Sequence, residues 1–157
     1  MAGNIGAKER AVIVLTSTGA SMSSGSAIAV GTDLDARTGG NAPDDLLCKF
    51  QLTCQFATVT GIAVDTIIAD IYLLPKLDGT NLPTIDATSG ASALPYSCFV
   101  GSFVAVKVPT AAVDMLIVSP RVDLDPLLHT VHLIGRSGQT ISANWVLKLI
   151  PWQAQYT

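Results

Sequence analysis

The strongest constraint on the fold is a strict alternation of apolar and polar residues over residues 46–57, LLCKFQLTCQFA. Every second residue from Cys48 to Phe56 is apolar, and the residues between them are Lys49, Gln51, Thr53 and Gln55. A period of two places one face of a β-strand in a core and the other toward solvent, whereas a helix would scatter the same apolar residues around its circumference. The segment is therefore predicted to be an amphipathic strand with one buried face.

Similar apolar segments recur along the chain between loops rich in Gly, Pro and Asp. One of them, Ile67–Leu74, is apolar on both faces except for Asp70, which is typical of a central strand covered on both sides. About eight strands and no helix are predicted, at residues 11–16, 27–30, 46–57, 67–74, 97–108, 113–119, 128–134 and 141–150. Short strands at this spacing, with no internal repeat and no break in composition, predict one all-β domain, an antiparallel β-sandwich that is jelly-roll-like.

The N-terminal segment contributes little to this predicted core. Residues 1–10 are expected to form a mobile arm, and residues 11–157 the sandwich domain. The apolar run Ala11–Leu15 is interpreted either as an edge strand or as part of an arm donated to a neighbouring chain. This run is too short for the apolar region of a signal peptide, and no stretch approaches the ~18 apolar residues of a membrane span. No membrane partner is expected.

Charged residues are unusually scarce. They make up 13% of the 157 residues, about half of the ~25% found in soluble domains. Because monomers rarely expose large apolar patches, part of this neutral surface is expected to be buried against other copies in a homo-oligomer. The formal net charge of −3 and a pI of about 5.1 argue against a nucleic-acid-binding module, which carries a basic stripe.

The three cysteines do not form a disulfide framework. Cys48 and Cys54 are six positions apart in one predicted strand, or roughly 20 Å at strand rise, which is beyond the reach of a disulfide. Cys98 could pair with either across strands, but a free, buried thiol is the favoured interpretation. Synthesis and assembly in a reducing cytoplasm follow from this pattern.

Two histidines, His129 and His132, raise the hypothesis of a metal site. Positions three apart on a strand point to opposite faces, so both side chains cannot easily bind one ion. The apolar residues around them make the helix that such a site would need improbable on sequence grounds. No metal ligand is therefore assigned.

Two aspartate pairs, Asp33/Asp35 and Asp123/Asp125, have the i, i+2 spacing that places two carboxylates on one face. Such pairs serve as ligands for hard cations or as a catalytic acid and base. Both pairs fall in polar segments, where turn-forming aspartates on solvated loops are the favoured interpretation. No nucleophile elbow, P-loop or dinucleotide motif occurs, so no catalytic or cofactor-binding residue is assigned and no enzyme is predicted.

Aromatic residues offer one further possibility, a platform for sugars. Trp145, Trp152, Tyr96 and Tyr156 could line it, although aromatic residues are only 6% of the chain and Trp145 falls in the core register of its strand.

The segment Ile68–Pro75, IADIYLLP, followed by Leu77–Pro83, LDGTNLP, resembles small structural proteins of tailed bacteriophages. In those proteins a strand ending in YLLP runs into a loop of the form DGTNxP. The similarity covers roughly residues 45–152 and includes Phe99–Phe103, the Pro120-Arg121 bend, a hairpin around Arg136–Gln139 and the final Pro151-Trp152.

Capsid decoration (cement) proteins are the most similar of these in size and composition. The resemblance implies a non-enzymatic virion protein that docks as an oligomer, with a trimer favoured, on the major capsid protein at the head surface. It implies synthesis in the host cytoplasm and no site residues. A head–tail or tail component is the nearest alternative, and a carbohydrate-binding sandwich displayed for host attachment is another.

Overall fold

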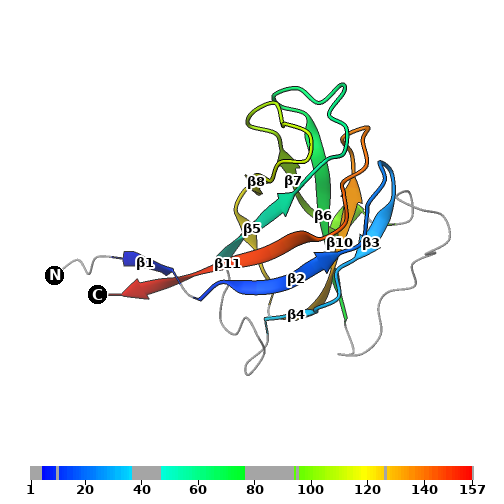
Figure 1. Ribbon diagram of the computed structural model, residues 1–157. Helices are drawn as coiled ribbons and strands as arrows, with labels where there is room; N and C mark the ends of the chain where they lie inside the picture. The colour runs from blue at the N-terminus through cyan, green and yellow to red at the C-terminus, as the bar shows by residue number, and fades with distance from the viewer. Residues whose placement is uncertain are drawn as a thin grey trace.

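Two antiparallel β-sheets pack face to face in this protein (Figure 1). The computed structural model describes residues 5–9, 11–36, 47–76, 94, 96–125 and 127–156. Within these ranges there are eleven strands and one short 3-10 helix, Tyr96–Cys98. The predicted β-sandwich is confirmed, but the expected number of eight strands is too low.

The first sheet has six strands. Strands β11 and β5 pair with each other at its centre. On its other edge, β11 pairs with β1 and β2. On its other edge, β5 pairs with β8 and β9. The strands are β1 (Ile5–Glu9), β2 (Ile13–Gly19), β5 (Leu47–Cys54), β8 (Met115–Val118), β9 (Val122–Asp123) and β11 (Trp145–Tyr156).

The second sheet has five strands in the order β3–β10–β6–β7, and β4 also pairs with β10. They are β3 (Ala27–Ala29), β4 (Leu34–Asp35), β6 (Ile67–Pro75), β7 (Phe99–Val104) and β10 (Leu128–Gly135).

The eleven strands occupy only eight sheet positions. Three positions are each filled by two consecutive short strands on the same neighbour: β1 and β2 on β11, β3 and β4 on β10, and β8 and β9 on β5. The two sheets then read β2–β11–β5–β8 and β3–β10–β6–β7. Successive positions alternate between the two sheets except at β6 and β7, which are neighbours in the second sheet, and this order is that of an eight-position jelly roll. The undercount in the prediction arises because loops interrupt strands without changing their place in the sheet.

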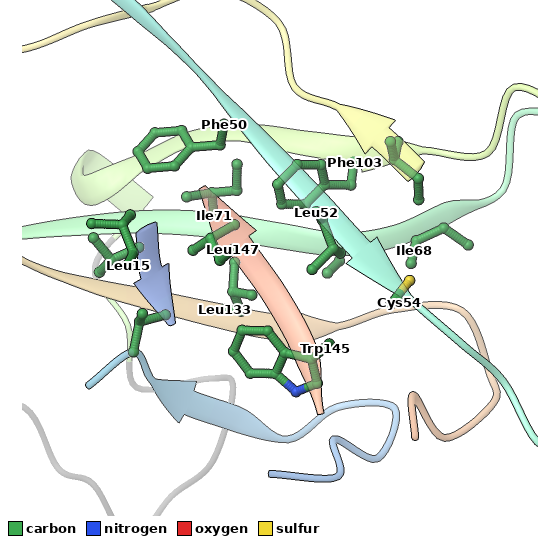
Figure 2. Packing of buried hydrophobic residues seen from close by; sticks show 14 of the residues in the cluster. Leu15, Phe50, Leu52, Cys54, Ile68, Ile71, Phe103, Leu133, Trp145 and Leu147 are labelled. Atoms are coloured by element: carbon green, nitrogen blue, oxygen red, sulfur yellow. The ribbon is translucent and has the colours of Figure 1, made fainter. Parts of the chain in front are cut away.

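The core lies between the sheets and is built by the alternation seen in the sequence. Along β5, every second side chain from Cys48 to Cys54 is buried and the residues between are half-buried. Figure 2 shows Phe50 and Leu52 from this strand packed with residues of both sheets: Ile71, Phe103, Leu133, Trp145 and Leu147. The register predicted for this strand is therefore correct.

Strand β6 is covered on both faces, as predicted. Ile71 and Leu73 face the main core. Tyr72 and Leu74 point outward into a second apolar cluster with Leu94 and Ile134, against which Cys98 and Phe99 pack. This outer cluster forms because Leu94, Cys98 and Phe99 lie against the outward side chains of the second sheet.

The last strand begins later and ends later than predicted. Residues 141–150 were expected to form it, but β11 starts at Trp145 and continues to Tyr156. Asn144 has a φ of 67°, which interrupts the extended backbone, and Ala143 is exposed rather than in the core register. Ile141 instead forms isolated bridges with Met22 and Phe56.

Two other predicted boundaries also differ. The strand expected at 97–108 is shorter, because the 3-10 helix occupies its start and only Phe99–Val104 is extended. Within the expected N-terminal arm, residues 5–9 form β1, and the rest of residues 1–10 lie outside the described residues. Most of the loop predicted at 75–96 also lies outside them.

Candidate functional site

The two histidines lie on β10, where they have different surroundings. His129 is opposite Leu34 on one side and Pro75 on the other, and it is 4% exposed. Nδ1 of His129 and Nε2 of His132 are buried without a hydrogen-bond partner. Burial lowers the pKa of both imidazoles below their usual value, while Asp125 and the Leu127 backbone act in the opposite direction on the pKa of His129. Both rings are therefore expected to be neutral at pH 7.

The first aspartate pair is more structured than a solvated turn, so the prediction of turn-forming loop residues is wrong for it. Asp33 accepts hydrogen bonds from Lys76 Nζ at 2.6 Å and from Thr130 Oγ1 at 3.0 Å. Asp35 belongs to β4 and is opposite Leu128. The Asp33 carboxylate thus connects the residue before β4 to β10 and to the residue after β6, which is a structural role.

The second pair is exposed, as expected for loop residues. Asp123 ends β9 and lies 3.6 Å from Arg121 Nε, with both side chains largely in solvent. Asp125 follows it, and its charge acts on His129. Asp125 and His129 are only four positions apart in the sequence, and this short spacing was the available signal that they line one pocket.

A pocket of about 210 Å³ lies where these segments meet. His129, Asp123 and Asp125 contribute polar groups, and Leu73 and Val100 contribute apolar walls; Pro75, Ser97 and Cys98 complete the lining. No group of three histidine, cysteine or acidic side chains in the described ranges has the arrangement of a metal site. The pocket combines hydrogen-bonding groups with an apolar wall, as sites for small polar molecules do.

None of the three cysteines forms a disulfide. Cys48 and Cys54 are buried in β5, and burial raises the pKa of the Cys54 thiol to about 12. Such a thiol remains protonated and unreactive at neutral pH. Cys98 is half-buried beside the pocket and is the most accessible of the three.

The aromatic residues do not form a sugar platform around Trp145. This side chain is 2% exposed in the core, and its Nε1 donates a hydrogen bond of 2.6 Å to the Ala20 carbonyl. Trp152 and Tyr156 lie on β11 opposite Glu9 and Ile5, and their side chains are outside the described residues.

The sequence analysis did not anticipate a group of exposed aliphatic residues at one end of the sandwich. We call this group the valine tip: Val64, Ile67, Val106, Val108 and Val113, which are 44–75% exposed. Its valines lie in the two loops after β5 and β7, at the top of Figure 1 and away from the chain termini, and Ile67 is the first residue of β6. Valine-rich loops were the available signal, since valine is common in strands and unusual in exposed turns.

Backbone hydrogen bonds join the segment after β5 to the segment after β7, and so hold the two sides of the valine tip together. Asp65 N donates to the Ala105 carbonyl at 2.8 Å, and Ala105 N donates to the Thr66 carbonyl at 2.9 Å. Ala112 N donates to the Phe56 carbonyl at 2.8 Å. Asp65 and Ala112 have φ values of 67° and 55°, which surrounding structure must hold in place. The exposed aliphatic side chains are thus presented on a fixed framework.

No model of a known protein family matches this sequence, and no curated protein is detectably related to it. No helix in the described part of the chain has the length and apolar character needed to cross a membrane.

Proposed function

We propose that this chain is a non-enzymatic structural protein of a tailed-bacteriophage virion, most specifically a capsid decoration protein. In this proposal it is made in the host cytoplasm and docks as a homo-oligomer, with a trimer favoured, on the major capsid protein at the head surface. The observation that carries the proposal is the valine tip, a set of exposed aliphatic side chains on hydrogen-bonded loops of a protein with half the usual charge. Proteins that function by assembly need such surfaces, whereas catalysis needs converging reactive groups.

Two further observations support this proposal. The segment that resembles phage structural proteins, Ile68–Pro75, corresponds to most of β6, the strand buried on both faces. The jelly-roll order recurs in viral capsid and lectin domains, although a fold alone does not assign a function.

The proposed activity is mechanical. A docked oligomer adds interface between capsid subunits, and each Å² of apolar surface removed from water contributes about 25 cal/mol before the costs of association. A rigid domain loses little conformational entropy on docking, so more of that energy strengthens the shell.

Binding of the purified protein to undecorated heads, followed by electron microscopy, tests the proposal. We expect saturable decoration of the head surface, greatly weakened by Val106→Asp combined with Val108→Asp. Val14→Asp, at a residue that is 50% exposed on β2, is the matched control. Heads and virions that never carry this chain would overturn the proposal, and a location only on the tail would support the head–tail alternative.

The pocket beside His129 favours one second candidate, recognition of a carbohydrate on the host surface. Asp123, Asp125 and Ser97 line it with groups that hydrogen-bond to sugar hydroxyls. We expect glycan-array binding that is lost in Asp125→Ala but retained in Asp114→Ala, whose carboxylate instead accepts a hydrogen bond from Gln55. An array without binding would remove this candidate.

A further inference from the structure

The two ends of the chain form a two-stranded ribbon. In this terminal ribbon, β1 pairs antiparallel with residues 152–156 of β11, in a register that places Ile5 opposite Tyr156 and Glu9 opposite Trp152. The ribbon extends away from the body of the sandwich, at the left of Figure 1.

The ribbon lacks support from the rest of the described structure. The pairing of β5 with β11 ends at Leu47, which is opposite Trp152, so among the described strands residues 153–156 pair with β1 alone. An isolated two-stranded ribbon is marginally stable in water, and a third strand or a packed layer is needed to hold it.

A break in the ladder separates β1 from β2. Glu9 is opposite Trp152 and Ile13 is opposite Leu149, so the chain has three positions between these residues on one side of the ladder and two, Ile150 and Pro151, on the other. One extra residue on one strand is what a β-bulge contains. Pro151, at this break, has no N–H to donate to a neighbouring strand. The chain can therefore change direction between β1 and β2 without breaking the pairing of β2.

We propose that in the assembled oligomer β1 crosses to a neighbouring copy of this chain and pairs there with the end of its β11. The proposal rests on the oligomer of the proposed function. Exchange costs little, because the same main-chain hydrogen bonds form within one chain or between two, and only the ribbon has to open. A neighbouring copy also supplies the packing that the ribbon lacks, so reciprocal exchange would link the subunits.

Disulfide trapping between chains that each carry one introduced cysteine tests the exchange; Cys48 and Cys54, which are buried, are kept. Ala7 and Ala154 are opposite each other in the ribbon. We mix tagged Ala7→Cys chains with untagged Ala154→Cys chains, both of which also carry Cys98→Ala. The mixture is unfolded, refolded and then oxidised. Lys8→Cys with Gln153→Cys is the parallel pair, because successive antiparallel pairs alternate between narrow and wide spacing. We expect a mixed disulfide dimer of one tagged and one untagged chain from at least one of these mixtures.

Gln51→Cys with Lys148→Cys is the control mixture, since these residues are opposite each other on β5 and β11 inside the closed sheet. It should give no mixed dimer. The exchange is overturned if the ribbon disulfides form only within single chains that carry both introduced cysteines, such as Ala7→Cys with Ala154→Cys, and never between two chains. An oligomer without mixed dimers overturns the exchange and leaves decoration intact. Mixed dimers in a protein that never binds heads support the exchange and remove the proposed function.

Discussion

The outer faces of the two sheets differ sharply in what covers them. On the first sheet, Leu116 and Val118 of β8 are 55% and 42% exposed. On the second sheet, Leu74 and Ile134 are fully buried in the outer cluster, and Tyr72 packs edge-on against Phe99 with ring centroids 5.6 Å apart. Aliphatic residues in outward positions of a strand are therefore buried on one sheet and open to solvent on the other.

This contrast shows how burial on an outward face depends on a covering segment. Leu94 and Cys98, which precede β7, and Phe99 at its start pack against the outward side chains of the second sheet. Beside this cluster, Asp70 accepts hydrogen bonds of 2.6 Å from both Arg136 Nε and Ser102 Oγ, which satisfies the one carboxylate in an otherwise apolar strand. The described residues place no such cover over β8, so its outward face remains a surface available to another molecule.

The largest expected effect concerns the two faces of β5. Phe50→Asp should abolish soluble, folded protein, because burying an unpaired carboxylate costs several kcal/mol, comparable with the ~5–15 kcal/mol stability of a whole domain. Gln51→Asp is the control, since Gln51 is half-buried on the outward face opposite Lys148. Soluble yield and circular dichroism measure both. Equal tolerance of the two changes would contradict the observed register.

The outer faces themselves can be compared by truncating one aliphatic residue on each. Ile134→Ala should lower the free energy of unfolding by about 2–4 kcal/mol, since it removes buried methyl groups and leaves a cavity. Leu116→Ala should change it by less than about 0.5 kcal/mol in the isolated protein. Denaturant unfolding measures both. A large loss in Leu116→Ala below the concentration of assembly would show that the first sheet also has a cover.

The carboxylate beside the outer cluster should matter more than an exposed one. Asp70→Ala leaves the Arg136 guanidinium and the Ser102 hydroxyl without their acceptor and should cost about 1–3 kcal/mol. Asp123→Ala removes an ion pair between largely exposed side chains and should cost less than about 0.5 kcal/mol. If Arg136→Leu in the Asp70→Ala background restores no stability, the loss does not come from an unpaired charge.

The smallest effect is the pH dependence of the histidines on β10. Because burial lowers the pKa of His129 and His132, the unfolded chain binds more protons than the folded chain below the ordinary histidine pKa of about 6.5. Their contribution to stability is complete above this pH and is lost as the pH falls toward the folded pKa values. His129→Gln and His132→Gln should each flatten the decline of Tm between pH 7 and pH 5. An unchanged pH profile in both variants would exclude buried neutral histidines.

The local pattern of the sequence determined much of the fold. Alternation in 46–57 identified β5 and its buried face, and the continuous apolar run 67–74 identified a strand covered on both sides. Both inferences depend only on the period-two geometry of a strand and on the cost of exposing apolar area. The same reasoning failed at 141–144, because one residue with a positive φ ends an extended run without changing its apolar composition.

Only the tertiary structure decided which distant residues meet. The jelly-roll order, the linked loops of the valine tip and the terminal ribbon all depend on pairing between segments far apart in the chain. Local sequence carries little information about such pairing, because main-chain hydrogen bonds are the same for every residue except proline. Asp33 illustrates the difference: its sequence context is that of a polar loop, and its bonds to Lys76 and Thr130 exist only because β6 and β10 lie side by side.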